Sequence, residues 1–263
     1  MKAERMSRWL FAFAVAVVFS SASAADVRVM ISAGFYQAYS ELVPVFERNS
    51  GHRLITTRGP SLGNSPEAIP ERLKRGEPAD VVLMVAASVD DLARQGLVRA
   101  DTKVDLARSQ IGMVVRAGSR KPDIATVEGL RRTLLEAKSI AYSDSASGIY
   151  LSTTLFARLG IAEQVAGKSR KVPGPPSGEP VAAVVARGEA EIGFQQVSEL
   201  IHEPGVDYVG PIAAELQQDT RYSGALTSNA RETAAAQALI RFLASREAAA
   251  TIVKAGLTPL PQP

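Results

Sequence analysis

Residues 79–85 carry the sequence Ala79-Asp80-Val81-Val82-Leu83-Met84-Val85, whose last five members are all apolar. A strand with one face in water alternates apolar and polar residues, whereas a strand covered on both faces is apolar throughout. The run therefore predicts a strand of a parallel sheet with helices on both sides. Ser88, with Asp91 three residues later, fits a capping box and predicts a short helix that begins at Ser88.

The segment before this strand predicts two more strands with a helix between them. Residues 27–32 and 53–57 are short β-rich runs. Between them, Phe35, Tyr39, Leu42 and Phe46 recur at the spacing of one helix face, and a glycine at position 51 suits the helix end. The alternation of strands and helices predicts an α/β fold with crossover helices.

The same alternation resumes further along the chain, which predicts a second unit. Strands are expected at 111–116, 139–142, 170–172 and 191–195, and helices at 127–138, 148–159, 181–187 and 232–254. We assign residues 25–107 and 219–263 to lobe I and residues 108–218 to lobe II. The Pro- and Gly-rich stretch 173–178 is expected to be a loop, because strand–helix units lie on both sides of it.

The N-terminus has the pattern of an export signal. Lys2, Arg5 and Arg8 precede an unbroken apolar run over 9–19, and small residues follow at Ala22-Ser23-Ala24. The run is too short to remain across a bilayer, so residues 1–24 are predicted to be a cleaved signal peptide. No later stretch is long and apolar enough for a span, which predicts a periplasmic protein that is not embedded in the membrane.

Composition excludes several classes of function. Removing residues 1–24 takes away three basic residues and one acidic residue, which lowers the net charge from +3 to +1 and gives no support for nucleic-acid binding. The chain has no cysteine, so disulfides, thiol nucleophiles and cysteine metal sites are excluded. Its two histidines are far apart in sequence. We therefore expect no metal and no cofactor, and we expect a monomer.

Three strand-to-helix junctions are rich in small polar residues. They are Ser32-Ala33-Gly34, Arg58-Gly59-Pro60-Ser61-Leu62-Gly63-Asn64 and Ser143-Asp144-Ser145-Ala146-Ser147-Gly148. Helix N-termini attract anions through unpaired N–H groups, and ligands of open α/β sheets bind at the carboxyl ends of strands. The junctions predict an anion site, although serine and glycine are also common in ordinary caps and turns.

Other residues near these junctions have two interpretations. Gln195 and Gln196 end an apolar strand, and they either face a ligand or begin a solvated turn. Arg58 is the only cation at the junctions, so it is either a carboxylate clamp or a surface residue. Tyr150, one turn into its expected helix, either belongs to the core or points its hydroxyl at the cleft.

These motifs carry a resemblance to the class II periplasmic binding proteins of the molybdate-binding group, over essentially the whole mature chain. The resemblance rests on four segments, which are Ser32-Ala33-Gly34, residues 75–81, residues 146–150 and residues 186–193. It implies a type II fold of two α/β lobes, each a mainly parallel sheet flanked by helices, joined by crossing strands. By the same resemblance, Ser32, Ser61 and Ser147 fall where such proteins contact an oxyanion.

Two departures from that group point to a different anion. Gln196 stands where the group usually has a tyrosine, and the second junction contains Arg58 and Pro60 in place of a Gly-Ser-rich turn. A guanidinium fork matches a planar carboxylate better than a tetrahedral dianion. These two departures therefore favour a polycarboxylate ligand over molybdate.

The junction sequences, together with residues 193–200, are similar to those of bacterial aconitate isomerases built on this fold. This resemblance implies interconversion of trans- and cis-aconitate by an allylic proton shift, which requires a grip on three carboxylates and a proton shuttle. The expected substrate contacts are Ser32, Gly34, Arg58, Ser61, Asn64, Ser145, Ser147, Gln195 and Gln196. For the shuttle we expect Asp144 or Tyr150, although Asp144 also suits a helix cap.

The alternative is a transport receptor that delivers an oxyanion or organic acid to an ABC permease. The fold hosts both functions, because function resides in the site and not in the scaffold. Gln196 and Arg58 weigh against molybdate but leave carboxylate transport open.

Overall fold

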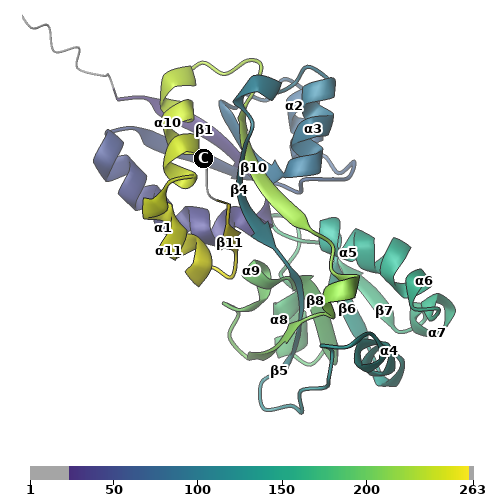
Figure 1. Ribbon diagram of the computed structural model, residues 1–263. Coiled ribbons are helices and arrows are strands. Elements are labelled where there is room, and N and C mark those ends of the chain that lie inside the picture. Colours follow the sequence, from purple (N-terminus) through teal and green to yellow (C-terminus); the bar gives the residue numbers. More distant parts are fainter. Residues whose placement is uncertain (1–23, 261–263) are drawn as a thin grey trace, which may run out of the picture.

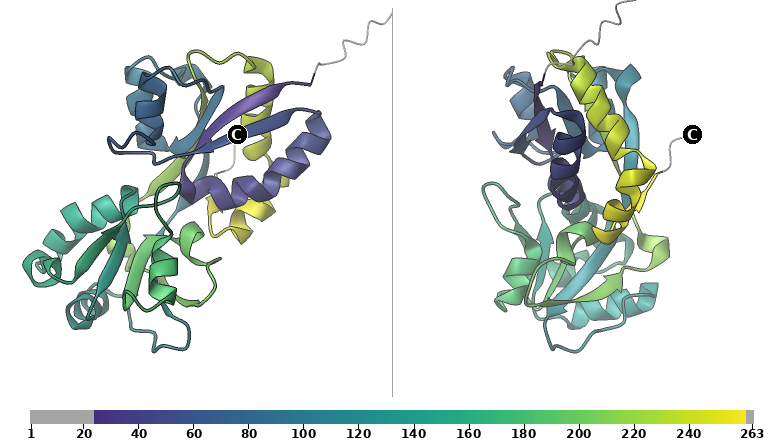
Figure 2. Two further views of the ribbon diagram at one scale, coloured as in Figure 1. Left: turned by 180° about the vertical axis from the view of Figure 1, so that it is seen from behind. Right: turned by 90° about the vertical axis from the view of Figure 1, so that its left-hand side faces the viewer.

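The computed structural model describes residues 24–260 and forms two α/β lobes (Figures 1 and 2). The predicted signal peptide lies outside the described residues, apart from its last residue. Lobe I contains a six-stranded sheet in the order β11-β4-β10-β3-β1-β2. Its strands are β1 Asp26–Ile31, β2 Arg53–Arg58, β3 Val81–Val85, β4 Val104–Ser109, β10 Thr220–Leu226 and β11 Thr258–Pro259.

Lobe II contains a five-stranded sheet in the order β7-β6-β8-β5-β9. Its strands are β5 Ile111–Arg116, β6 Ile140–Ser143, β7 Ser169–Val172, β8 Ile192–Gln196 and β9 Val206–Pro211. In each sheet three neighbouring strands are parallel, with β1 between β2 and β3 in lobe I and β6 between β7 and β8 in lobe II. The prediction of two α/β lobes is confirmed, but each sheet is mixed and not mainly parallel, because β4 and β10 in lobe I and β5 and β9 in lobe II pair antiparallel with their neighbours.

Helices cover both faces of each sheet. Those of lobe I are α1 Ala33–Ser50, α2 Ile69–Lys74, α3 Ala86–Arg94, α10 Thr233–Leu243 and α11 Arg246–Lys254. Those of lobe II are α4 Val127–Glu136, α5 Ala146–Tyr150, α6 Phe156–Arg158, α7 Ala162–Ala166, α8 Val181–Ala186 and α9 Val197–Leu200, with a π-helical turn over Leu151–Leu155. Short 3-10 turns lie at Ala100–Thr102 and Ala214–Leu216.

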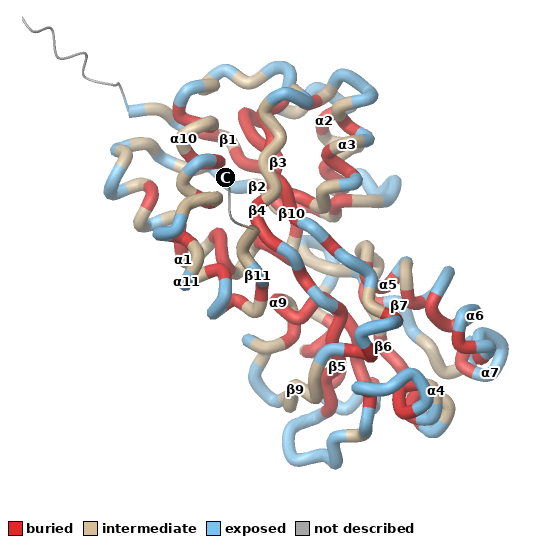
Figure 3. The backbone as a smooth tube through the Cα atoms, in the orientation of Figure 1, coloured by how far each residue is buried: buried red, intermediate tan, exposed pale blue. Residues whose placement is uncertain are grey.

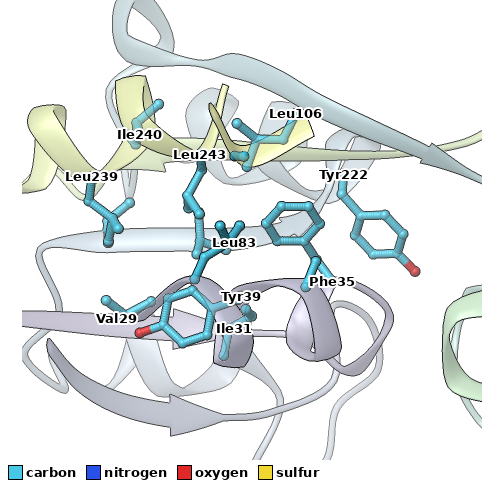
Figure 4. Close-up of a cluster of buried hydrophobic side chains, with 14 of the residues drawn as sticks. Val29, Ile31, Phe35, Tyr39, Leu83, Leu106, Tyr222, Leu239, Ile240 and Leu243 are labelled. Carbon is cyan, nitrogen blue, oxygen red and sulfur yellow. The ribbon is translucent and has the colours of Figure 1, made fainter. Parts of the chain in front are cut away.

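The surroundings of strand β3 explain why its sequence is apolar throughout. Val81 and Leu83 pack into the cluster formed with α1, α10 and α11, whereas Val82 and Met84 pack into the cluster on the opposite face of the sheet, beneath α2 and α3. Figure 3 shows this buried centre continuing along the strands of both lobes, and Figure 4 shows the cluster around Leu83. The prediction of a strand covered on both faces is confirmed.

Two segments run between the lobes. Strand β4 passes into β5 through Gln110, and the chain returns from β9 to β10 through residues 212–219. Strand β4 pairs with β10 in lobe I and β5 pairs with β9 in lobe II, so the two connecting segments run side by side between the lobes (Figure 1).

Some sequence-based boundaries were wrong. Helix α3 begins at Ala86, directly after β3, so Ser88 lies inside the helix with its hydroxyl buried and does not cap it. The expected helix over 232–254 is divided at Ala244 and Ser245 into α10 and α11. Strands β4, β9 and β10 were not expected, because their side chains do not follow a single alternating pattern.

Candidate functional site

A cavity lies between the lobes, at the carboxyl ends of the parallel strands of both sheets. Its lobe I wall comes from the β1–α1 junction, the turn after β2, the end of β3, and Tyr222 on β10. Its lobe II wall comes from the β6–α5 junction, the loop after β7 and the β8–α9 junction. The lining residues are Ser32, Ala33, Gly34, Gly59, Pro60, Ser61, Val85, Ser143, Asp144, Ser145, Ala146, Gly174, Pro175, Gln195, Gln196, Glu199 and Tyr222.

On the lobe I wall, Ser32 precedes α1 and is buried, yet its hydroxyl has no hydrogen-bond partner in the protein. A buried polar atom normally has a partner, so this hydroxyl is free for a ligand. The first turn of the 18-residue α1 also offers backbone N–H groups that no helical carbonyl accepts. Ser61, across the cavity wall, accepts a hydrogen bond from the Val85 backbone N–H at 3.1 Å and keeps its own proton to donate.

Gly34 is required at the second position of α1 by a close approach. A Cβ atom there would lie 1.8 Å from the Tyr222 hydroxyl oxygen. The Tyr222 ring stacks on Phe35 with 6.3 Å between centroids, and Figure 4 shows its hydroxyl pointing away from the hydrophobic cluster. Burial raises the pKa of Tyr222 well above its ordinary value, so the hydroxyl stays protonated as a donor at the edge of the cavity.

The lobe II serines form a hydrogen-bonded group. The Ser143 hydroxyl lies 2.7 Å from that of Ser145 and 3.1 Å from that of Ser147. Ser147 is fully buried behind this pair and does not line the cavity. The Asp144 carboxylate, between them in sequence, accepts a hydrogen bond from the Gly174 backbone N–H at 3.1 Å and so holds the loop after β7 against the cavity.

The two glutamines at the end of β8 are both buried but have different surroundings. Gln196 donates to the Thr220 hydroxyl at 3.1 Å, while its carbonyl oxygen has no partner. A hydroxyl both donates and accepts, so Thr220 satisfies either orientation of the amide, and Gln196 can present its NH2 group to a carboxylate. Gln195 uses both ends of its amide within the protein, since it accepts from the Val181 N–H at 3.2 Å and donates to Glu199 at 2.6 Å.

Glu199, on α9, is the carboxyl group with the most unusual environment in the cavity. Removal from water raises its pKa to about 7, against the opposing effects of the Gln195 hydrogen bond and the charge of Arg58. The negative charge of Asp144 raises this pKa further. A carboxyl with a pKa near neutrality exists in both protonation states at working pH, which is what proton transfer in both directions requires.

Helix α9 also ties the lobes together. The Ser198 hydroxyl of lobe II donates to the backbone carbonyl of Gly34 on α1 of lobe I, at a distance of 2.7 Å. Since Ser198 precedes Glu199, the same contact that holds the lobes together fixes where the Glu199 carboxyl lies.

The structure brings together most of the residues expected from the sequence. Ser32, Gly34, Ser61, Asp144, Ser145, Gln195 and Gln196 line the cavity. The others do not: Ser147 lies behind Ser143, Asn64 is exposed on its loop, and the Tyr150 hydroxyl donates to the Leu216 carbonyl at 2.8 Å. Arg58 lines a second cavity beside the first.

Sequence reasoning missed Glu199 and Tyr222. A signal for Glu199 was present, because it lies three residues after Gln196, just beyond the carboxyl end of a predicted strand. The same position drew attention to the three junctions that were selected. Tyr222 had no comparable signal, because it reaches the cavity from β10, a strand that the sequence did not predict.

Two further observations concern the residues that the structure describes. Within residues 24–260, no helix has the length and apolar character needed to cross a membrane. In the same range there is no group of three or more acidic or histidine side chains suited to a metal ion.

Comparison with known sequences identifies similar proteins over most of the chain. The family model for bacterial extracellular solute-binding proteins matches residues 27–258. An aconitate isomerase from a Pseudomonas species is 48% identical over 233 residues, which is 89% of this chain and 87% of that protein. A molybdate-binding protein from Azotobacter vinelandii is 26% identical over 94% of this chain and 95% of its own length.

Solved structures show the same fold at lower identity. The periplasmic molybdate-binding protein of Azotobacter vinelandii superposes with a TM-score of 0.70 at 20% identity, over 90% of this chain and all of that one. A sulfate-binding protein from Mycobacterium tuberculosis gives a TM-score of 0.72 at 19% identity, over 90% of this chain and 87% of that one. At these identities the likeness concerns the fold alone.

Proposed function

We propose that this chain, which belongs to the family of bacterial extracellular solute-binding proteins, is an aconitate isomerase that interconverts trans- and cis-aconitate in the cavity between its lobes. The identity of 48% to an aconitate isomerase over most of both chains supports this activity. The observation that carries it is Glu199, a carboxyl group in the cavity wall whose pKa of about 7 suits proton transfer.

The reaction is a proton shift along an allylic system. Glu199 in its carboxylate form removes a proton from the methylene carbon of aconitate, and the electrons of that C–H bond form a new double bond to the central carbon. The old double bond opens, and its electrons spread onto the carboxylate conjugated with it. The protonated Glu199 then returns a proton to the former vinyl carbon, so the atoms balance and no oxidant or reductant takes part.

The cavity provides donors for the charge that develops on the substrate. The free Ser32 hydroxyl and the first N–H groups of α1 come from lobe I, and the Gln196 amide comes from lobe II. Preorganised donors of this kind stabilise an oxyanion without reorganising during the reaction. Gln195 does not reach the substrate in this proposal; it holds the Glu199 carboxyl by a 2.6 Å hydrogen bond.

We further propose that the protein acts in the periplasm after removal of residues 1–24. The family is extracellular, which supports export, and the charged and apolar pattern of residues 2–24 supports a cleaved signal. To test this, the full chain is expressed in a Gram-negative host and the mass of the protein recovered from the periplasm is measured. The expected mass is that of a mature chain beginning near Ala25.

The activity is tested directly on the mature protein. Purified residues 25–263 are incubated with trans-aconitate, and cis-aconitate is followed by chromatography, with Glu199→Gln as the matched inactive variant. In parallel, thermal unfolding is measured with trans-aconitate, molybdate and tungstate. Turnover by the wild type that is lost in the variant supports the proposal. Strong stabilisation by molybdate with no turnover of aconitate overturns it in favour of a transport receptor.

A further inference from the structure

A second cavity lies directly beside the one described above. The two share Ala33, Pro175, Gln195 and Glu199, so the Glu199 carboxyl stands in the wall between them. The remaining lining of this outer cavity is Tyr36, Gln37, Arg58, Pro180, Ser198, His202 and Glu203. Tyr36 and Arg58 belong to lobe I, whereas His202 and Glu203 belong to lobe II, so the outer cavity also spans both lobes.

Arg58 is held in the outer cavity without an acidic partner. It is the last residue of the edge strand β2, and its guanidinium carbon lies 4.1 Å above the centre of the Tyr36 ring. Its Nε atom is buried and donates no hydrogen bond, and within residues 24–260 no carboxylate lies within ion-pair distance of it. Stacking fixes the plane of the guanidinium while leaving its N–H edge available for a planar acceptor.

Two acidic residues line the outer cavity together with Arg58, and neither forms an ion pair with it. Glu199 faces the outer cavity from α9, and its raised pKa keeps it partly neutral near pH 7. Glu203 is the other acidic residue of the lining, and the exposed His202 lies beside it. The buried Nε of Arg58 therefore has no hydrogen-bond acceptor in the described part of the protein. Because buried donors normally have a partner, a carboxylate of a bound ligand can fill this role.

We propose that the outer cavity is a subsite in which Arg58, stacked on Tyr36, binds the central carboxylate of a tricarboxylate whose reacting carbons lie beside Glu199. The subsite makes the protein prefer tricarboxylates over dicarboxylates that lack the corresponding group. The inference rests on the proposed function for the identity of the substrate, and it extends that function to selectivity.

The test uses two saturated ligands that cannot isomerise, so it does not depend on turnover. Binding of propane-1,2,3-tricarboxylate and of glutarate to the mature protein is measured by calorimetry for the wild type and for Arg58→Gln. Arg48→Gln, an exposed α1 residue outside both cavities, is the matched control for loss of one positive charge. Tyr36→Leu is a second variant, which removes the stacking surface but keeps the charge.

We expect the wild type to bind the tricarboxylate at least 10-fold more tightly than glutarate. Arg58→Gln should weaken tricarboxylate binding about 10- to 100-fold and glutarate binding less than about 3-fold, because it removes a charge-assisted pair with the central carboxylate, which glutarate lacks. Tyr36→Leu should give a smaller change in the same direction, and Arg48→Gln should leave the preference unchanged.

The subsite is overturned if Arg58→Gln weakens both ligands equally, changes neither, or if the wild type shows no preference. Failure of the proposed function is distinct from this. A wild type that prefers the tricarboxylate through Arg58 but does not turn over trans-aconitate contradicts the isomerase and supports the subsite. Turnover of trans-aconitate with an unchanged preference in Arg58→Gln supports the isomerase and contradicts the subsite.

Discussion

The β1–α1 junction of lobe I and the β8–α9 junction of lobe II are built alike but have different chemical content. Each follows a strand that lies between two parallel neighbours or inside its sheet, and each leads directly into a helix at the cavity. The first presents Ser32 and Gly34, a small hydroxyl and a residue without a side chain. The second presents Gln196 and Glu199, an amide and a carboxyl whose pKa is about 7.

This difference indicates a division of labour between the lobes. A junction of small residues brings backbone N–H groups close to an anion, as binding requires. A junction with a partly desolvated carboxyl places a proton donor and acceptor beside that anion, as proton transfer requires. The Ser198–Gly34 hydrogen bond joins the two junctions, so closing the lobes assembles both parts of the site at once.

The largest effect is expected from removing the proton carrier of lobe II. Glu199→Gln should lower kcat for trans-aconitate about 10³-fold, the typical contribution of a positioned general acid–base, while substrate binding changes little. Steady-state kinetics combined with calorimetry separate the two quantities. Loss of binding with kcat preserved would show that Glu199 grips the substrate, and the division between the lobes would fail.

The next largest effect is expected from adding a Cβ atom at one glycine in each lobe. A Cβ at Gly148 would lie 1.6 Å from the backbone oxygen of Ser143, whereas a Cβ at Gly34 meets the end of the Tyr222 side chain. Gly148→Ala should therefore cost about 3 kcal/mol of unfolding free energy, and Gly34→Ala about 1 kcal/mol. Urea unfolding measures both. Equal costs would mean that Tyr222 is as rigidly held as backbone.

Removing the free hydroxyl of lobe I should affect binding more than chemistry. Ser32→Ala is expected to raise KM for trans-aconitate about 10-fold, because it deletes one charge-assisted hydrogen bond, and to lower kcat by less than about 3-fold. Ser88→Ala is the matched control, since that hydroxyl is also buried without a partner but lies outside the cavity. A similar loss in both variants would indicate a general effect on the fold of lobe I.

The smallest effect concerns the pKa of Glu199. The Gln195 hydrogen bond lowers this pKa, so Gln195→Leu should raise it from about 7 by about one unit. Because the base must be deprotonated, the acid limb of the kcat/KM profile should move to higher pH by the same amount. An unchanged midpoint, measured between pH 5 and 9, would contradict the positioning role of Gln195.

The same pKa predicts how stability depends on pH. The folded Glu199 keeps its proton up to a pH of about 7, whereas in the unfolded chain it loses the proton near its ordinary value of 4.5. Its contribution to stability is therefore greatest below that value and is lost as pH rises towards 7. Glu199→Gln should remove this part of the pH dependence, which thermal unfolding across the range would detect.

Local sequence patterns were sufficient where one strand or helix carries the signal. The apolar run at Val81–Val85, the helix face of Phe35 to Phe46 and the polar junctions at Ser32 and Ser143 were all placed correctly. The expected roles of Tyr150 and Gln195 could not be judged in the same way. Whether a side chain reaches a cavity depends on its partners, here Leu216 for Tyr150 and Val181 with Glu199 for Gln195.

The sequence by itself determined a two-lobed α/β protein with anion-attracting junctions, because hydrophobic periodicity and small polar residues act over short stretches of chain. Only the tertiary structure decided which carboxyl could carry a proton. The pKa of Glu199 depends on burial between two lobes and on Gln195, Arg58 and Asp144, which come from three different strand ends. These groups come close to Glu199 only after both lobes have folded and packed together, so no local sequence pattern predicts the pKa of Glu199.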